Sequence, residues 1–245
     1  MKKFIFISSI IFALFVTNTI NAERYTLKIG DFNEIKVINN VNVVYSNNPD
    51  SLGYAVFYGT KEFADAFIFS NKNGCLRIEV SAEKINNPNL PTLQIYSRFL
   101  QKVENSSDFK LHIKNLAPSP ELKAKLIGNG TIIINNIDAT KINAHVSTGN
   151  GSIILNGACS DAVYKMVGTG IIDAIGLKAT SVNCAIFGTG EIKCWATESL
   201  KSKGVGTTKI FYIGTPKTIK KSGGGNLIQC SENETIEEES TTIEE

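Results

Sequence analysis

A short glycine-containing phrase that recurs six times constrains the fold of this chain more than any other feature. Its copies read GNGTI, GNGSI, GTGII, GTGEI, GTTKI and GGGNL, and their first glycines are Gly128, Gly149, Gly168, Gly188, Gly206 and Gly223. Successive first glycines are 21, 19, 20, 18 and 17 residues apart. A repeat of this length, with no helical periodicity between the phrases, is typical of a solenoid in which each repeat forms one coil.

Aligning the repeats places similar side chains at equivalent positions. The fourth residue after the first glycine is aliphatic in every repeat: Ile132, Ile153, Ile172, Ile192, Ile210 and Leu227. A second aliphatic column is expected from Ile142, Val163, Val182, Leu200 and Ile219. Equivalent residues of stacked β-coils lie about 4.8 Å apart, so such columns predict continuous core ladders. The sequence therefore predicts an all-β protein, a parallel β-solenoid with coils of about 19–20 residues.

The glycines are expected to form tight corners, where a positive φ or a close backbone approach excludes a side chain. A dinucleotide-binding G-x-G-x-x-G loop is a poor alternative, because that loop occurs once, between a strand and a long helix. The expected structural turn glycines are Gly128, Gly130, Gly149, Gly151, Gly168, Gly170, Gly188, Gly190, Gly206, Gly223 and Gly225.

The first half of the chain also has a β pattern, but a less regular one. Short alternating runs occupy 35–37, 41–45, 54–58, 66–70, 76–80 and 92–96, separated by turns rich in Asn, Ser and Gly. Residues 97–109 fit either a short helical turn or a loop. The segment Ala117-Pro118-Ser119-Pro120 marks a seam between an irregular half, 23–117, and a repeat-built half, 118–230. One continuous stack is favoured there over a separate domain.

The N-terminal segment has the pattern of an export signal. Lys2 and Lys3 precede an apolar run from Phe4 to Val16, and a polar stretch then ends at Ala22. The run is shorter than the roughly 20 apolar residues of a membrane-spanning helix, so a cleaved signal peptide over 1–22 is favoured over an uncleaved anchor. Cleavage is expected between Ala22 and Glu23, giving a protein in the periplasm, on the outer surface or secreted, with no transmembrane segment after signal removal.

Charge is divided between the body and the tail. Residues 23–230 contain 23 basic and 16 acidic residues, a formal charge of +7, whereas 231–245 contain seven glutamates and no base. The acidic tail is expected to be disordered, with a role in solubility favoured over a specific partner. A possible patch for an anionic partner comprises Lys201, Lys203, Lys217, Lys220 and Lys221. It lacks interleaved aromatic residues, so nucleic acid is not an expected partner.

Catalytic signals are weak. Glycoside hydrolysis needs two carboxylates facing each other across a sugar, and the nearest candidates are Asp173 and Glu191 in neighbouring repeats. A chance pair of surface acids is the favoured interpretation. His112 and His145 have no Cys, His or acid at metal-ligand spacing, and no nucleophile elbow is present, so neither a metal nor a cofactor is expected. The five cysteines show no C-x-x-C spacing and are expected to act mainly as buried thiols rather than disulfides.

These features together resemble a known family. The spaced G-x-G turns, preceded by FNEIKVINNVNVVYS at 32–46 and NGCLRIEV at 73–80, are similar to the auto-transporter-adhesin head, or GIN, domain family. The resemblance covers roughly residues 30 to 228 and implies a right-handed parallel β-helix of an exported bacterial protein. It favours a non-catalytic, adhesin-like module that presents a flat β face to a glycan or protein at the cell envelope. The alternative is a carbohydrate-active enzyme, a polysaccharide lyase or hydrolase on a β-helix.

Overall fold

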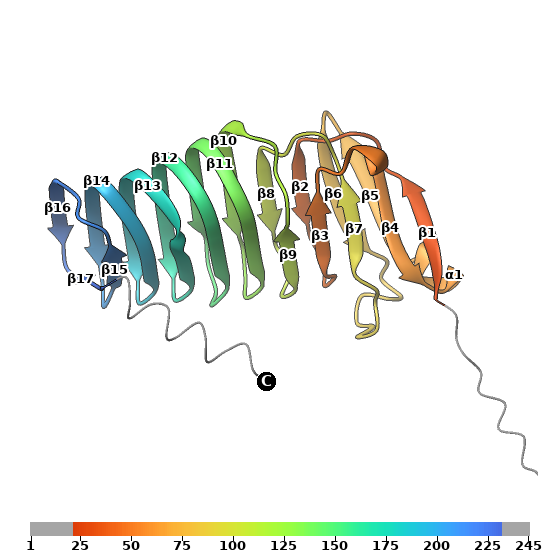
Figure 1. The fold of residues 1–245 in the computed structure, drawn as a ribbon. Helices are drawn as coiled ribbons and strands as arrows, with labels where there is room; N and C mark the ends of the chain where they lie inside the picture. The colour runs from red at the N-terminus through yellow and green to blue at the C-terminus, as the bar shows by residue number, and fades with distance from the viewer. Residues whose placement is uncertain (1–21, 232–245) are drawn as a thin grey trace, which may run out of the picture.

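The computed structural model describes residues 22–231, which form a rod of stacked β-strands (Figure 1). Almost all of the expected signal peptide and of the acidic tail lie outside these residues. The strands are β1 (Glu23–Lys28), β2 (Glu34–Val37), β3 (Val43–Ser46), β4 (Tyr54–Gly59), β5 (Phe67–Lys72), β6 (Cys75–Val80), β7 (Leu93–Tyr96), β8 (Lys102–Asn105), β9 (Lys110–Ile113), β10 (Ser119–Leu126), β11 (Thr131–Val146), β12 (Ser152–Gly168), β13 (Ile171–Gly188), β14 (Glu191–Val205), β15 (Lys209–Ile213), β16 (Thr218–Gly223) and β17 (Asn226–Gln229). Two short helices, η1 (Pro49–Ser51) and α1 (Lys61–Ala64), lie in the first half.

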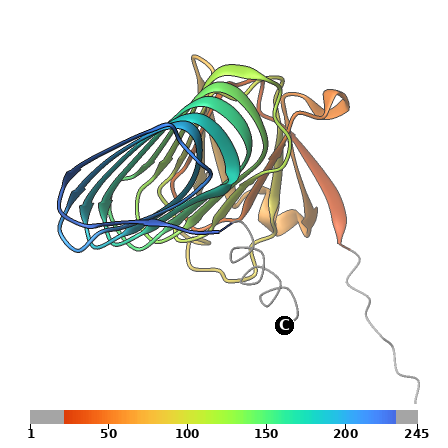
Figure 2. The same cartoon turned by 60° about the vertical axis from the view of Figure 1, so that its left-hand side comes forward.

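Each coil is flattened, so the rod has two long β faces (Figure 2). Face A consists of β1, β4, β7, β3 and β9, continued by the first parts of β11 to β14 and then by β15 and β17. Face B consists of β5, β6, β2, β8 and β10, continued by the later parts of β11 to β14 and then by β16. The prediction of an all-β solenoid is confirmed, with about 6 turns.

The long strands cross from face A to face B at a bend. The pairing of β11 with β12 shifts register between Ile134 and Ile137, and β12 with β13 between Ile154 and Gly157. Asn136 and Gly157 have φ angles of 55° and 135° at this bend. An irregularity of this kind turns the chain while the backbone bonds to the neighbouring coil resume on either side.

The first aliphatic column is present as expected. Ile132, Ile153, Ile172, Ile192 and Ile210 pair in register from coil to coil and are at most 3% exposed. The second column differs from the expectation at one position. Ile142 pairs with Ala162, and Ala162 with Val182, whereas Val163 pairs with Asn143 and points outward. The expected register was wrong by one residue there because the bend changes the pairing: residues up to Ile134 pair with residues 21 positions later, and residues from Ile137 onward pair with residues 20 positions later.

The first half stacks in an order that differs from the sequence. The coil formed by β2 and β3 lies between β6 and β7 on one side and β8 and β9 on the other. Beyond β6 and β7, the strands become antiparallel, with β1 on β4, β4 on β7 and β5 on β6. Residues 97–109 contain β8 rather than a helical turn. The seam at 117–120 leads into β10, which pairs in parallel with β8 and β11. In the described part of the chain, no helix is long and apolar enough to span a membrane.

Candidate binding face

The corner glycines that the sequence singled out fall into two geometric kinds. The first glycine of each phrase has a positive φ, from 77° at Gly223 to 142° at Gly188, a region that disfavours residues with a Cβ. The second glycine of a phrase leaves no room for a side chain: a Cβ at Gly151 would lie 2.6 Å from the carbonyl oxygen of Gly130. Gly130, Gly170 and Gly190 are crowded in the same way. In the last phrase the second glycine, Gly225, also has a positive φ. The corners are therefore close-packed backbone, with little room for a ligand.

The fifth phrase lacks its second glycine, and Thr208 takes that place. Its side chain is 2% exposed and occupies the space next to Gly204 and Gly225. A Cβ at either glycine would clash with the Thr208 hydroxyl. The substitution is therefore compensated by one glycine at the end of β14, Gly204, and one in the following coil, Gly225.

The two candidate acids do not lie directly opposite each other, and each carboxylate has a polar partner close by. Asp173 and Glu191 both point outward on face A, in adjacent coils and two positions apart, because Asp173 pairs in register with Lys193 and Glu191 with Ile171. The Asp173 carboxylate accepts a hydrogen bond from the backbone N–H of Ile175 at 3.2 Å. The Glu191 carboxylate lies 3.9 Å from the Lys193 ammonium. Each acid already has a local partner that explains its position.

The five lysines of the expected patch separate into three environments. Lys201, Lys203 and Lys220 point outward on face B. Lys217 lies in the preceding turn and forms an ion pair with Glu198 at 2.8 Å. Lys221 pairs in register with the inward-facing Ser202, so it lies over the end of the core rather than on the face.

Lys165 also lies on face B, although the sequence alone did not single it out. Lys165 pairs with Ala185, and Ala185 with Lys203, so Lys165 lies in the same outward row as Lys203. Counting outward positions along the repeats would have found this row. We call the exposed group Lys165, Lys201, Lys203 and Lys220 the lysine cluster. Within residues 22–231, none of its members forms an ion pair.

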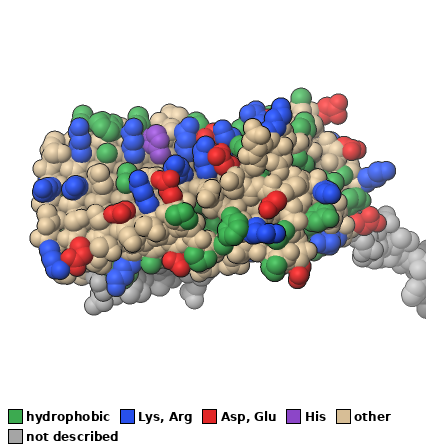
Figure 3. Space-filling view, turned by 90° about the horizontal axis from the view of Figure 1, so that it is seen from above, with side chains coloured by type: hydrophobic (Ala, Val, Ile, Leu, Met, Phe, Trp, Pro, Cys, Tyr) green, Lys and Arg blue, Asp and Glu red, His purple; other side chains and the backbone are tan. Residues whose placement is uncertain are grey.

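The other half of face B also carries basic side chains, and most of them form ion pairs. Its cations face acids on the same or neighbouring strands, in the pairs Lys102–Glu34 at 3.1 Å, Lys123–Glu121 at 3.0 Å, Lys125–Glu104 at 3.6 Å, Lys141–Glu121 at 3.8 Å, and Arg77–Glu79. Figure 3 shows one side of the rod, where Lys and Arg side chains recur along its length with acidic ones among them. The lysine cluster thus brings together four lysines of face B that form no ion pair within the described residues.

His145 lies in the row between these two parts of face B. It pairs in register with Lys125 on one side and Lys165 on the other. Burial lowers the pKa of His145, and the charges of Lys165 and Lys125 lower it further. Its Nε2 is buried and has no hydrogen-bond partner among the described residues. The ring is therefore held neutral more strongly than an ordinary histidine, which limits repulsion within the row.

A row of exposed apolar side chains runs beside the lysine cluster. Val167, Phe187 and Val205 pair in register and are 39%, 37% and 52% exposed. They precede the corner glycines and lie two positions beyond Lys165, Ala185 and Lys203 on the same strands. The Lys203 ammonium lies 5.9 Å from the centroid of the Phe187 ring. We call these three side chains the apolar row.

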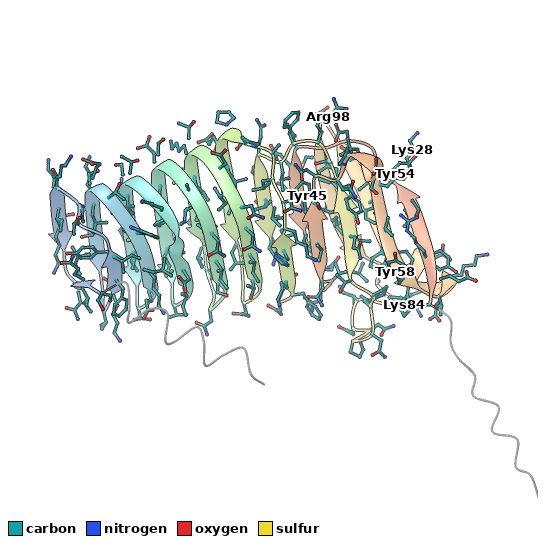
Figure 4. The ribbon with its side chains drawn as sticks, viewed as in Figure 1. Lys28, Tyr45, Tyr54, Tyr58, Lys84 and Arg98 are labelled. Atoms are coloured by element: carbon teal, nitrogen blue, oxygen red, sulfur yellow. The ribbon has the colours of Figure 1, made fainter. Side chains whose placement is uncertain are left out.

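A different exposed group lies at the other end, on face A. Tyr54 and Tyr58 of β4 are 39% and 52% exposed, and Lys28 and Arg24 of β1 pair with them in register (Figure 4). These side chains belong to the antiparallel strands, which do not continue the regular ladders. The described residues include no group of three or more His, Cys, Asp or Glu side chains that could hold a metal.

Comparison with known proteins agrees with this architecture. The family described as "Putative auto-transporter adhesin, head GIN domain" matches residues 31–216. The chain belongs to this family. A putative adhesin from Bacteroides fragilis is 24% identical, with a TM-score of 0.78 over 87% of this chain and 98% of its own. A putative adhesin from Parabacteroides merdae is 20% identical, with a TM-score of 0.64 over 86% and 97%.

A third solved structure carries a different description. It is named a putative lipid binding protein, comes from Parabacteroides distasonis, and is 22% identical, with a TM-score of 0.64 over 86% of this chain and 98% of its own. At these identities the three structures share the fold with this GIN-domain chain. No curated protein matches the sequence.

Proposed function

We propose that this GIN-domain chain is an adhesin-like, non-catalytic binding module of the cell envelope, which uses face B to hold a glycan or protein partner. The observation that carries the proposal is the contrast within face B. Lysines 102, 123, 125 and 141 lie within 4 Å of a carboxylate, whereas the lysine cluster has no such partner in residues 22–231. Unpaired cations on a rigid sheet attract an anionic partner and need little reordering to bind it.

The family and its relatives support the same general role. The family description and two of the structural relatives carry the word adhesin, which fits a protein that contacts an external partner. The signal-like segment 1–22 supports export to the periplasm or the outer surface. Intact-mass analysis of the exported protein tests this step. We expect a chain that begins at Glu23, and a mass that retains residues 1–22 would contradict it.

The competing proposal is a carbohydrate-active enzyme that uses Asp173 and Glu191. These acids lie on face A, whereas the lysine cluster lies on face B, so the two proposals predict effects on opposite sides of the rod. If the chain were such an enzyme, Asp173→Asn or Glu191→Gln would abolish product release from a polysaccharide. If it is a binding module, neither substitution changes retention of the partner.

The binding experiment compares two quadruple variants of the mature chain. The first replaces Lys165, Lys201, Lys203 and Lys220 by Gln, and the second replaces Lys102, Lys123, Lys125 and Lys141 by Gln. Both remove four positive charges from face B, so net charge is matched. Retention on envelope fractions and immobilised polysaccharides is measured together with product release. We expect the first variant to lose retention and the second to keep it. Equal loss in both would show that only net charge matters and would contradict the proposal.

A further inference from the structure

We infer that the partner of face B is an acidic polysaccharide that lies along the rod axis, with its acid groups over the lysine cluster and its ring faces against the apolar row. The inference rests on the proposed binding function and adds the chemical class and direction of the ligand. It follows from the spacing of the lysines, the flat surface between them and the position of the apolar row.

The lysine cluster extends along the rod rather than around it. Lys201 and Lys220 pair in register in adjacent coils, about 4.8 Å apart. Lys165 and Lys203 occupy one row with Ala185 between them, so they are two coils, or roughly 10 Å, apart. A ligand with one compact charge would contact only part of this array. A polymer with an acid on successive units can contact all of it.

The surface between the lysines is low and open. Ala185 lies in register between Lys165 and Lys203, and Asn183 lies in the neighbouring row between Val163 and Lys201. These short side chains leave a flat strip beside the lysines. Such a strip suits an extended chain that lies on the sheet, because an extended ligand gains many weak contacts at once.

The apolar row selects a polymer with rings. Phe187 is flanked by Val167 and Val205 in a line parallel to the lysine rows. The Lys203 ammonium lies near the Phe187 ring, so one ligand unit can meet a charge and an aromatic face together. The side chains of the row are 37–52% exposed and lie at the ends of the strands, next to the corner glycines. The row therefore offers a contact surface alongside the ligand rather than a wedge that inserts into a membrane.

Charge complementarity alone would also admit an acidic polypeptide or an anionic lipid surface. The apolar row separates these cases, since a polypeptide of glutamates has charge without ring faces. A lipid surface would need both valines and Phe187 to insert, and it has no axial repeat to match the lysines. The polysaccharide is the partner that uses both features of the surface.

Four probes test the inference with the mature chain. Polygalacturonate supplies rings and charge, and its fully methyl-esterified form supplies rings without charge. Polyglutamate supplies charge without rings, and phosphatidylglycerol vesicles supply an anionic lipid surface. Dissociation constants are measured at low and physiological salt for the wild type, Lys201→Gln/Lys203→Gln and Phe187→Ser. The controls are Lys102→Gln/Lys123→Gln and Phe99→Ser, which change a paired lysine set and an aromatic side chain that is 53% exposed elsewhere.

We expect polygalacturonate to bind and its methyl ester to bind at least roughly tenfold more weakly, since loss of several charge contacts should cost more than one decade in affinity. Lys201→Gln/Lys203→Gln should weaken polygalacturonate binding by a similar factor, and salt should weaken the wild type. Phe187→Ser should reduce binding of polygalacturonate severalfold and leave any binding of polyglutamate unchanged. The two control variants should bind as the wild type does. Circular dichroism melts verify that each variant is folded.

The inference is overturned if polyglutamate binds as tightly as polygalacturonate and Phe187→Ser has no effect, because the surface would then be a general polyanion site. It is also overturned if only the vesicles bind. If no probe binds but envelope fractions are still retained through the lysine cluster, the inference fails and the proposed function stands. If the lysine cluster is not needed for envelope retention either, both fail.

Discussion

The two halves of the rod reach the same stacked architecture by different routes. From β10 onward each coil follows the previous one in sequence, and in-register pairing joins neighbours along the chain. Before β10 the chain places β2 and β3 inside the stack and then returns outward through β4 to β7. The repeat-built half is thus held by contacts about 20 residues apart, and the first half by contacts over longer separations.

The first half adds aromatic packing to its aliphatic ladders, one of which runs from Leu93 through Val43 and Leu111 to Ile132. Tyr25 stacks on Phe57 with ring centroids 5.1 Å apart, and Phe57 meets Phe67 edge-on at 5.2 Å. Tyr45, drawn inside the stack in Figure 4, is fully buried, and its hydroxyl donates to the carbonyl oxygen of Ser97 at 3.0 Å. Burial raises the pKa of Tyr45 to about 12. Large side chains fill the space where the coils are irregular.

The difference teaches which substitutions each half tolerates. A repeat-built stack depends on a few backbone positions that recur in every coil, so a change at a corner disturbs its neighbours. An irregular stack depends on individual side chains with specific partners. Substitutions at a stacked corner should therefore destabilise the rod most.

Replacing both Gly149 and Gly151 by Val should cause the largest loss of stability. Gly149 has a φ of 88° and Gly151 lacks space for a Cβ, so the two residues suffer strain and overlap together. Such positions cost on the order of 1–3 kcal/mol each. Chemical denaturation measures the loss, and hydrogen exchange should show the adjacent coils opening first. Asn150→Thr is the matched control and should be nearly neutral, because the next two corners carry Thr.

A single substitution sharpens the same prediction. Gly128 has a φ of 108°, but a Cβ there would be 3.8 Å from the nearest atom, a side-chain oxygen of Asp108. Gly128→Ala should therefore cost only the strain of the backbone, about 1 kcal/mol. Gly149→Ala should cost more, since its Cβ would overlap the backbone of Gly128. Equal losses would show that crowding at the stacked corners does not contribute.

The sequence predicted the regular half well because its information is local and repeated. The column from Ile132 to Leu227 follows from counting within each phrase. The same counting failed at Val163, because the bend after Ile134 changes the pairing from 21 to 20 residues apart. It could not predict the position of β2 and β3, because pairing across 60 or more residues leaves no period in the sequence. Of the five lysines in the expected patch, Lys217 and Lys221 leave face B at the last coil, and the patch itself stays a prediction.

The second column tests how the stack ends. Leu200 and Ile219 occupy adjacent coils in register, but Leu200 is fully buried and Ile219 is 45% exposed. Leu200→Ala should cost roughly 2–5 kcal/mol, as for other buried leucines. Ile219→Ala should cost well under half of this, because less apolar surface is removed from contact. Urea denaturation of both variants measures the difference, and similar losses would mean that the last coil is packed as firmly as the interior.

Tyr45→Phe tests the irregular half with a smaller change. The substitution keeps the ring but removes the hydrogen bond to the Ser97 carbonyl, which lies in a fully buried residue. We expect a loss of about 1 kcal/mol in the free energy of unfolding. Tyr164→Phe is the matched control in the repeat-built half, because the Tyr164 hydroxyl is buried and has no hydrogen-bond partner in residues 22–231. That variant should be neutral or slightly more stable, so a larger loss at Tyr164 than at Tyr45 would contradict the contrast.

The smallest effect should come from pH, through His145 on face B. Burial, Lys165 and Lys125 lower the pKa of His145 in the folded chain from its ordinary value of 6.5. Between the lowered pKa and 6.5 the unfolded chain binds more protons than the folded chain, so acid favours unfolding and stability falls as the pH drops through 6.5. His145→Asn should remove part of this dependence, measured as the difference in denaturation midpoint between pH 7.5 and pH 5.5. His112 should keep the remainder, since burial and its flanking Lys114 and Lys110 lower its pKa in the same direction. If the His145→Asn variant shows the same difference in denaturation midpoint as the wild type, burial and the charges of Lys125 and Lys165 do not hold this ring neutral.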